Sequence, residues 1–328
     1  MHQGTWFSWP HNAKTWPDCL EAAERAVTEA IVAVAATEAI HINVLDAEHR
    51  VLVAKRFNER IPGDRLRFHT IPTDDAWCRD HGPIFVLNGE RLTAIDFRFN
   101  AWGSKYPPWD LDDAAGARMA AALNLPCERI DLVLEGGSVE VNGAGVCLTT
   151  EQCLLNPNRN PSRSRGEIEQ ALQHYLGVRQ VIWLGEGIAG DDTDGHIDDL
   201  TRFVAEDTVV TVIEPDPLDV NHAPLQDNLE RLRAARLPGR KRLRIVEIPM
   251  PPPQVRNDER VPASYANFYI GNGVVLMPAF DDSTDLFAAE ILARCFPSRR
   301  IVPIDARALV TGLGTFHCLT QQIPAPQG

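Results

Sequence analysis

The sequence predicts an α/β protein in which a unit of helix, strand, polar residue and hairpin recurs about five times. Three observations favour this fold. Turn-forming dipeptides between apolar runs recur about every 60 residues, helical periodicity fills the stretches between them, and a short β-branched strand follows each helix. Repeated units either stack in a line or close into a ring. One polar residue at an equivalent place in each unit favours a ring, which brings these residues together near one axis.

Four segments have the pattern of a hairpin. Each opens with a polar residue and alternates towards a turn dipeptide, which an apolar run follows. Asn-Gly favours a hairpin because a type I′ turn needs positive φ at both central residues. The segments are Asp80–Asn100, Glu135–Thr150, His196–Glu214 and Ser264–Phe280, with turns predicted at Asn88-Gly89, Asn142-Gly143, Glu206-Asp207 and Asn272-Gly273.

The stretches between the hairpins predict helices, because apolar residues recur there at i, i+3 and i+4. The expected helices are Pro17–Thr37, Leu111–Leu125, Ser164–Val178, Pro224–Pro238 and Asp285–Phe296. Each leads into an expected strand, and these are His41–Leu45, Arg129–Leu134, Gln180–Leu184, Leu243–Ile248 and Arg300–Ile304. A last, shorter copy of the unit is expected over Thr311–Ile323.

Few stretches interrupt this pattern. Pro249–Pro253 is expected to be stiff and extended, and Asn156–Gly166 is a polar loop. Neither carries the shift in composition that marks a domain boundary. We therefore expect a single catalytic domain over residues 1–328.

Composition and charge exclude some classes of function. The chain has 328 residues, of which 44% are hydrophobic and 23% charged, as in a globular protein with a large core. Its 32 basic and 45 acidic residues give a net charge of −13. Because binding to phosphate backbones needs a basic face, nucleic acid is not an expected partner. Small cationic molecules are favoured instead.

The sequence also lacks the signs of a membrane or secreted protein. The longest purely apolar run, Ala30–Ala36, is far shorter than the roughly 20 residues that a bilayer requires. Met1–Trp6 has no signal-peptide pattern. The seven scattered cysteines are typical of reduced thiols in the cytoplasm. A homodimer is the default expectation for such an enzyme.

The residues that could carry chemistry stand before the hairpins. They are Asp80, Glu135, His196 with Asp198, Asn267 and Cys318. A cysteine thiolate is a natural nucleophile, and histidine moves protons near neutral pH. A pair of carboxylates recognises a planar cation such as a guanidinium. Converging on one axis, these residues predict a cysteine enzyme for a cationic substrate.

Structural roles stay open for several of them. Asp80 could form only a local ion pair with Arg79. Glu135 could cap a turn, although the two glycines after it favour close approach of backbone or ligand. The acidic segment Asp191–Asp199 could be a solvated loop or a site for a hard cation. It lacks the spacing of an EF-hand, and the chain has no His-Glu-x-x-His, so a metal is the less favoured interpretation.

Among the cysteines, Cys318 is the predicted nucleophile. It follows the glycine-containing segment Gly312–Phe316, and polar residues follow it. Cys78, beside an arginine, is a weaker candidate. His317 is expected to point away from Cys318 if the segment is extended, which makes His196 the better base. The remaining thiols considered are expected to lie in the core, and these are Cys19, Cys147, Cys153 and Cys295.

These residues lie in motifs that resemble the agmatine deiminase family of the guanidine-modifying (pentein) superfamily. The motifs are Trp77–Pro83, Glu135–Ser138, Cys147–Pro161, Thr193–Asp198, Ser264–Ile270, Pro278–Ser283 and His317–Gln322, together with Trp9-Pro10. The similarity extends over nearly the whole chain, and the motifs occur in order. The family's fold is a five-bladed α/β propeller of ββαβ units, which agrees with the repeat.

The resemblance implies a hydrolase that acts on C–N bonds of linear amidines. Agmatine and water would give N-carbamoylputrescine and ammonia, a step of putrescine and polyamine synthesis, with neither metal nor cofactor. Cys318 would be the nucleophile and His196 the acid/base. Asp80 and Asp198 would clamp the guanidinium of a small cationic substrate. Glu135 would be a further catalytic acid, and Trp77 would bind substrate.

Two departures from the family pattern leave alternatives open. Family members commonly have Gly-Gly-Gly-Asn-Ile where this chain has Gly312–Phe316, and a longer stretch where it has Pro249–Ser264. Either could reshape the pocket around the far end of the substrate. A deiminase of arginine, of peptidyl-arginine or of another guanidine is one alternative, although no arginine in the sequence is identified as a partner for an α-carboxylate. An amidinotransferase and a catalytically silent binding protein are the others.

Overall fold

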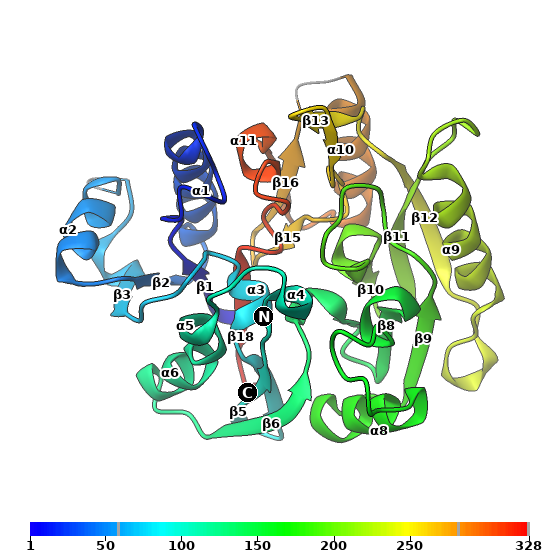
Figure 1. Cartoon of the computed structure of the whole chain (residues 1–328), viewed down its shortest axis with the longest axis horizontal. Coiled ribbons are helices and arrows are strands. Elements are labelled where there is room, and N and C mark those ends of the chain that lie inside the picture. Colours follow the sequence, from blue (N-terminus) through cyan, green and yellow to red (C-terminus); the bar gives the residue numbers. More distant parts are fainter. Residues whose placement is uncertain (58–59, 281–282, 327–328) are drawn as a thin grey trace.

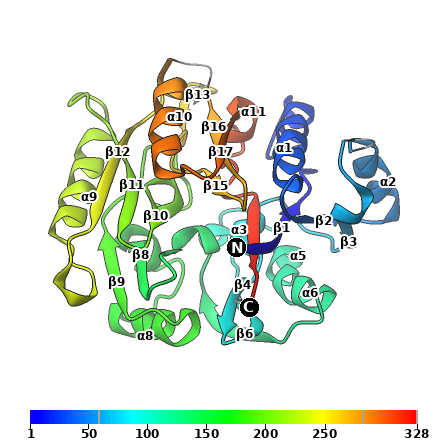
Figure 2. The ribbon, with the colours of Figure 1, turned by 180° about the vertical axis from the view of Figure 1, so that it is seen from behind.

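The structure, a computed structural model, describes residues 1–57, 60–280 and 283–326. It is a mixed α/β fold with several small mixed sheets. In the described residues, four three-stranded units and one four-stranded unit follow one another around the molecule (Figure 1). Seen from behind in Figure 2, the long helices lie at the periphery and the short helix α3 (Cys78–His81) lies near the centre. In the described residues, no helix is both long enough and apolar enough to cross a bilayer.

Four of the units have the same internal order. Two antiparallel strands form a hairpin, a helical segment follows, and a third strand pairs in parallel with the second. The strands are β4 (Ile84–Asn88), β5 (Arg91–Arg98) and β6 (Cys127–Val133), then β7 (Glu140–Val141), β8 (Val146–Thr150) and β9 (Gln180–Leu184), then β10 (Thr201–Ala205), β11 (Thr208–Ile213) and β12 (Arg244–Pro249), and last β15 (Tyr269–Ile270), β16 (Val274–Ala279) and β17 (Arg300–Asp305). The helices are α4 (Ala101–Ser104), α5 (Asp110–Asp113) and α6 (Ala115–Ala122), then α7 (Glu151–Leu154) and α8 (Arg165–Leu176), then α9 (His222–Ala234), and last α10 (Ser283–Cys295).

The remaining unit joins segments from opposite ends of the sequence. Strand β18 (Thr320–Pro324) pairs antiparallel with β1 (His2–Ser8), and β1 pairs in parallel with β2 (Ala39–Val44) after helix α1 (Leu20–Ala35). Helix α2 (Ala47–Lys55) and strand β3 (Leu66–Thr70) extend this sheet. The expected last copy over Thr311–Ile323 therefore contributes a single strand, and β1 completes its hairpin.

The local signals explain many of these elements. Helix α8 begins at a capping box, in which Ser164 and Glu167 hydrogen-bond each other's backbone N–H groups, and ends at Gly177 with φ 67°. The first hairpin turns at Gly89 and Glu90, because Asn88 pairs with Arg91. Only Gly89 of these two has positive φ, so the turn lies one residue later than predicted and is not of type I′.

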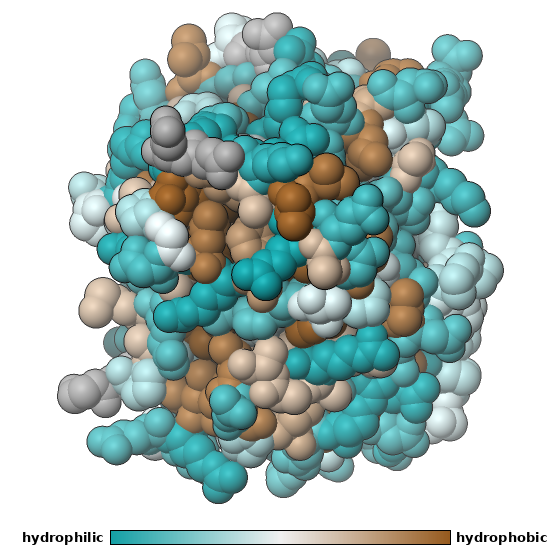
Figure 3. All heavy atoms as spheres, turned by 90° about the vertical axis from the view of Figure 1, so that its left-hand side faces the viewer, coloured by the Kyte–Doolittle hydropathy of each residue, from teal (hydrophilic) through white to brown (hydrophobic). Residues whose placement is uncertain are grey.

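Several expectations need correction. The helix expected over Leu111–Leu125 is two short helices, α5 and α6. Helix α2 was not predicted because its apolar residues do not share one buried face, and only Val53 is buried. Figure 3 shows this side of the molecule, where apolar patches alternate with hydrophilic side chains. The short stretch Pro249–Ser264, in which the sequence predicts only the extended segment Pro249–Pro253, contains a hairpin of β13 (Gln254–Arg256) and β14 (Glu259–Val261).

The largest hydrophobic core joins several units. It contains Trp9, Trp16 and Trp77 together with side chains from β2, β8, β11 and β16, and Cys318 itself belongs to it. A second cluster packs β5, β6, β8 and β9 against α8. A third, around Trp6 and Cys78, joins β1 and β18 to α6. Through these cores the short segments that precede the hairpins meet in the interior.

Candidate active site

Each predicted site residue lies at the start of a unit. Asp80 is in α3, before β4, while Glu135 precedes the short helix at residues 136–138. His196 and Asp198 lie at the short helix 197–199 before β10, and Cys318 precedes β18. All five side chains are buried. The structure thus brings together residues that are up to 238 positions apart in the sequence.

His196 stands at the centre of the cluster. Its Nδ1 lies 3.9 Å from Asp80 Oδ1 and 4.0 Å from Asp198 Oδ1, and its Nε2 lies 3.9 Å from Glu135 Oε2. Both ring nitrogens, Glu135 Oε2 and Asp198 Oδ1 are buried without a hydrogen-bond partner among the described residues. Buried polar atoms are normally paired, so these atoms are the ones available to a bound molecule.

Close packing of backbone makes this cluster possible. A Cβ on Gly137 would lie 2.6 Å from His196 Nδ1 and 2.8 Å from Asp80 Oδ1. The Gly137 N–H donates to that same Asp80 oxygen at 2.9 Å. The glycine predicted to allow close approach of backbone is therefore required at this position.

The Cys318 thiol faces the same carboxylates. Its Sγ lies 3.0 Å from Asn267 Nδ2 and 3.6 Å from Asp198 Oδ2. Asn267 also donates to Asp199 Oδ1 at 2.9 Å, so this amide joins the thiol to the acidic segment. Asn267 stands before the fourth hairpin, as the repeat predicts.

Asp80 is held by groups other than its neighbour in sequence. Trp102 Nε1 donates to Asp80 Oδ2 at 3.0 Å. Arg79 donates instead to Gln322 Oε1 at 2.7 Å and to the His317 carbonyl at 3.4 Å. The alternative that Asp80 serves only as an ion-pair partner of Arg79 is therefore wrong. Trp102 was missed because it lies in the short α4 turn, with no distinctive pattern around it.

Glu135 forms a buried ion pair that sequence reasoning also missed. Arg159 Nε donates to Glu135 Oε1 at 2.7 Å, while its other nitrogens donate to Asp194 Oδ2 at 2.5 Å and to the Thr193 carbonyl at 2.7 Å. Burial disfavours the Glu135 carboxylate, but the charge of Arg159 outweighs burial and lowers the pKa of Glu135 to about 2. Glu135 is thus held as an anion beside His196.

His317 does not point away from the site. The segment around it is a series of turns rather than an extended strand, and its Nδ1 lies 2.6 Å from Asp198 Oδ2. That expectation is therefore wrong. Burial, and then the nearby Arg202 and Arg79 charges, lower the pKa of His317 well below its ordinary value. A neutral His317 donates its Nδ1 proton to Asp198 and holds that carboxylate in place.

The acidic segment Asp191–Asp199 is a structured loop whose carboxylates have separate partners. Asp191 accepts hydrogen bonds from the backbone N–H groups of Thr193, Gly195 and His196. Asp192 accepts from Tyr106, and Asp194 from Lys105, Asn158 and Arg159. Asp191 therefore sets the position of His196 rather than joining the others in a cation site.

One other group of side chains has the spacing of metal ligands. Among the described residues, ligand atoms of Glu135, Cys153 and His196 lie within 4.8 Å of one another, and all three residues are buried. Cys153, expected to be a core residue, thus contacts the proposed acid/base. A thiol, an imidazole and a carboxylate are a ligand set that suits zinc.

Burial and charge determine the ionisation of the site. Burial raises the pKa of the Cys318 thiol well above its ordinary value, and Asp198, Asp199 and Asp80 raise it further. Burial alone would lower the pKa of His196, but Asp80, Cys153 and Glu135 outweigh it and raise that pKa well above 6.5. Without a bound cation, the site therefore holds a neutral thiol beside an imidazolium.

We expect the free thiol of Cys318 to react slowly with iodoacetamide at neutral pH. Only the thiolate is nucleophilic, and the raised pKa means that the thiolate forms only as the pH rises well above about 8.5, the ordinary value. The rate of alkylation, followed by mass spectrometry of the Cys318 peptide, should climb steadily from pH 7 to beyond about pH 9. The exposed Cys127 gives an internal reference. A rate that levels off near neutral pH would contradict this prediction.

A cavity of about 930 Å³ gives access to the thiol. Cys318, Asp80, Trp77 and Trp102 line one part of it. A Cβ on Gly314 would lie 2.6 Å from the Trp77 ring and 3.1 Å from Cys318 Cβ, so this tryptophan lies beside the nucleophile. Leu313 also lines the cavity and has φ 74°. It is the second residue of Gly312–Phe316, the segment that departs from the family's glycine pattern.

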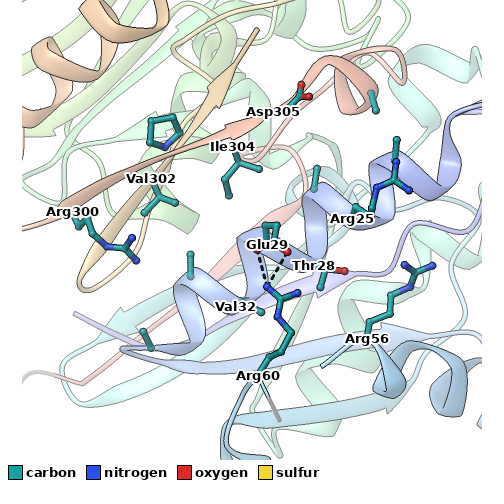
Figure 4. A pocket seen from close by; sticks show the side chains of 16 residues that line it. Arg25, Thr28, Glu29, Val32, Arg56, Arg60, Arg300, Val302, Ile304 and Asp305 are labelled. Atoms are coloured by element: carbon teal, nitrogen blue, oxygen red, sulfur yellow. Dashed lines mark hydrogen bonds and ion pairs between the residues drawn. The ribbon is translucent and has the colours of Figure 1, made fainter. Parts of the chain in front are cut away.

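A second cavity, of about 890 Å³, lies between α1 and β17 (Figure 4). Glu29 accepts hydrogen bonds from Arg60 at 2.8 and 2.9 Å across it. Arg25, Arg56 and Arg300 lie around the same space. In the described part of the chain, no cysteine or histidine and none of the predicted site residues lines this cavity.

Comparison with known proteins agrees with this fold. Residues 1–324 match the family model described as Porphyromonas-type peptidyl-arginine deiminase. The agmatine deiminase of Ectopseudomonas mendocina is 36% identical, over all of this chain and 94% of its own length. The solved agmatine deiminase of Enterococcus faecalis superposes with a TM-score of 0.93 at 31% identity, covering 99% of this chain and 94% of that one.

Two further structures extend the likeness. The agmatine deiminase of C. jejuni, solved as a Cys-to-Ser variant with substrate bound, has a TM-score of 0.90 at 32% identity, and 98% and 93% of the two chains are covered. An amidinotransferase of Microseira wollei has a TM-score of 0.53 at 11% identity over 100% and 95% of the chains, and thus shares the fold.

The mixed α/β units and these likenesses define a protein of the guanidine-modifying (pentein) superfamily. Within it, the chain belongs to the agmatine deiminase family. Two residues of its Pro278–Ser283 motif, Asp281 and Asp282, lie outside the described residues.

Proposed function

We propose that this protein is an agmatine deiminase, which hydrolyses agmatine to N-carbamoylputrescine and ammonia. The observation that carries the proposal is a buried thiol and an imidazole among carboxylates, beside a cavity that Cys318 and Asp80 line. Full-length relatives that are themselves agmatine deiminases support the choice of substrate. A guanidinium is a planar cation with several N–H donors, and this arrangement of acceptors suits it.

Asp80 and Asp198 would bind the guanidinium. Both are buried, and burial raises the pKa of each carboxyl, so a cation between them would stabilise the two buried anions. Trp77 and Trp102 would flank the substrate, since both line the cavity near Asp80. Aromatic faces attract cations of this kind. Binding would hold the guanidinium carbon near Cys318.

The same cation would activate the nucleophile. Its positive charge offsets the carboxylates that raise the pKa of Cys318, so the thiol gives its proton to solvent when substrate is present. The Cys318 thiolate then attacks the guanidinium carbon and forms a C–S bond. His196, as an imidazolium, gives its proton to the departing nitrogen, and ammonia leaves. The product of this half-reaction is a covalent thiouronium on Cys318.

The second half-reaction would use the same residues in reverse. Neutral His196 takes a proton from water, and the hydroxide attacks the thiouronium carbon. The C–S bond breaks, Cys318 leaves as a thiolate and the ureido product is released. Glu135, kept ionised by Arg159, stabilises the imidazolium whenever His196 carries the proton. Two easier steps thus replace one difficult hydrolysis.

One observation favours a second candidate, deimination of arginine. Arg256, from the β13–β14 hairpin, lines the same cavity, and its Nη1 donates to the Thr311 carbonyl at 2.5 Å. A guanidinium at this place can pair with a carboxylate. The sequence did not identify such an arginine, because the hairpin that carries it was not predicted.

Ammonia release from a panel of substrates tests the proposed function. The panel is agmatine, arginine, a short arginyl peptide and 4-guanidinobutyrate, each assayed with purified protein. Release from agmatine far above the others is the expected result. Release chiefly from arginine would show that the protein is an arginine deiminase, the second candidate. No release from any of them, with a folded protein, would favour an amidinotransferase or a binding protein.

We further propose that residues 1–328 form a single catalytic domain with the geometry of a five-bladed propeller. The five strand units and the β18–β1 pairing support this arrangement. We also propose that the protein is cytoplasmic and that it forms a homodimer. The seven free cysteines favour a reducing compartment, and two-fold dimers are the commonest assembly of such enzymes.

A further inference from the structure

We propose that Asp75 is the subsite for the substrate's ammonium group, and that it selects guanidino-amines over guanidino-acids. This proposal rests on the proposed function and adds a specificity-determining residue in the same cavity. Asp75 precedes Trp77 by two positions but was not among the predicted site residues. Both residues line the cavity that leads to Cys318.

The carboxylate of Asp75 is held by neutral donors. Thr15 Oγ1 donates to Asp75 Oδ2 at 2.5 Å, and the Ala76 N–H donates to Oδ1 at 2.7 Å. Across the described ranges, no lysine, arginine or histidine forms an ion pair with it. Each carboxylate oxygen can accept more than one hydrogen bond. Asp75 therefore keeps its charge and part of its accepting capacity for a ligand.

Besides Asp75 and the clamp residue Asp80, three other carboxylates of the described residues line the cavity. Asp112 faces His81 Nδ1 at 3.5 Å and accepts from the Asp74 N–H at 2.8 Å. Asp192 accepts from Tyr106. Asp74 accepts from the Leu111 N–H at 2.9 Å. Asp112 thus has a histidine partner. Within the described ranges, Asp74 and Asp192, like Asp75, accept only from neutral donors, so they are suitable for comparison with Asp75.

A continuous wall connects Asp75 to the nucleophile. Its partner Thr15 packs against Gly312, where an added Cβ would lie 2.9 Å from the Thr15 methyl group. Two residues on, Gly314 packs between the Trp77 ring and Cys318. The segment from Gly312 to Cys318 therefore runs from the Asp75 subsite to the thiol. A guanidinium at Asp80 leaves the alkyl chain of the substrate to follow this wall.

Charge supports the same assignment. Burial raises the pKa of Asp75 to about 6, although Thr15 and Ala76 stabilise its anion. A buried carboxylate without a cation is costly, and an ammonium beside it removes that cost. A guanidino-acid would instead bring a second anion towards Asp75, which like-charge repulsion disfavours.

The test compares agmatine with butylguanidine, which has the same guanidinium and alkyl chain but no amine. In the variant Asp75→Asn, we expect the KM for agmatine to rise by about 10- to 100-fold, the loss typical of a hydrogen bond to a charged group. The kcat should change by less than about threefold, because the amine is remote from the reacting carbon. The inhibition constant of butylguanidine, measured against agmatine, should stay within about twofold. The preference for agmatine over 4-guanidinobutyrate should fall.

Two matched variants serve as controls. Asp74→Asn removes the same charge from the neighbouring position, and its amide oxygen can still accept from Leu111, so we expect it to leave the KM for agmatine nearly unchanged. Asp192→Asn removes the charge at the Tyr106 wall. The assignment of the subsite would be overturned if the KM for agmatine rises in Asp192→Asn and not in Asp75→Asn, while the inhibition constant of butylguanidine stays unchanged.

Other outcomes are equally decisive. Equal weakening of agmatine and butylguanidine in Asp75→Asn would show that Asp75 only supports the loop that carries Trp77, and would reject the proposal. Failure of the proposed function would look different, because the wild-type protein would then release no ammonia from agmatine. In that case, calorimetric binding of agmatine and butylguanidine to wild type and Asp75→Asn still decides whether the amine is recognised.

Discussion

Replacing Cys318 with alanine is expected to abolish ammonia release, with kcat lowered by at least about 10³-fold. The thiol is the group from which the C–S bond would form, and no other thiol lines the cavity in the described residues. The loss of one sulfur beside Asn267 and Asp198 leaves the surrounding backbone hydrogen bonds in place. The measurement is steady-state turnover of agmatine, with circular dichroism to confirm that the variant folds.

The matched control is Cys78→Ala. Cys78 is also fully buried, but it packs in the cluster of Trp6 and Met119 and not on the cavity. Its loss should cost stability of about 1 kcal/mol and leave turnover nearly unchanged. Mass spectrometry of the wild type, quenched during turnover, should find the added mass on the Cys318 peptide. Activity that survives in Cys318→Ala and disappears in Cys78→Ala would show that the nucleophile is assigned wrongly.

Replacing His196 with asparagine is expected to lower kcat by about 10²- to 10⁴-fold, the usual contribution of a positioned acid/base. His196 would protonate the departing nitrogen in the first half-reaction and deprotonate water in the second, so both halves should slow. The raised pKa of His196 also predicts the pH profile of the wild type. The acid form is present below this pKa and is lost as the pH rises through it, so activity that needs the imidazolium should fall on the alkaline side.

An exposed histidine gives the control for that variant. His174, on α8, is far from the predicted site residues in the fold and is exposed, so His174→Asn should retain full activity. The alkaline limb of the kcat/KM profile should disappear in His196→Asn and persist in His174→Asn. Persistence of the limb in both variants, with kcat unaffected, would exclude His196 as the acid.

The sequence predicted the repeat because its signals are local. Asn-Gly turns and the capping box at Ser164 act over a few residues, and each hairpin places its leading polar residue at an equivalent position. From this regularity alone, the sequence predicts Asp80, Glu135, His196 and Cys318 as site residues. The pairing of β18 with β1 could not be predicted in this way, since no local pattern specifies a partner strand so far along the chain.

The missed residues share a different cause. Arg159 lies in a polar loop that suggests exposure, yet its side chain is fully buried because Glu135, Asp194 and the Thr193 carbonyl surround it. His317 was expected to alternate as in a strand, whereas turns around it direct the ring to Asp198. In both cases tertiary partners decide the position of the side chain. Periodicity describes only the neighbours in sequence.

The pairing of β18 with β1 also has a consequence for biosynthesis. A chain under translation holds every carboxylate of the site, and His196, long before residue 318 is made. Contacts between such distant segments form late in folding, because the entropy of closing the loop must be overcome first. The thiol of Cys318 can therefore join the carboxylates only after the C-terminal segment has been made. Chains interrupted before residue 318 lack this thiol and cannot form the covalent adduct.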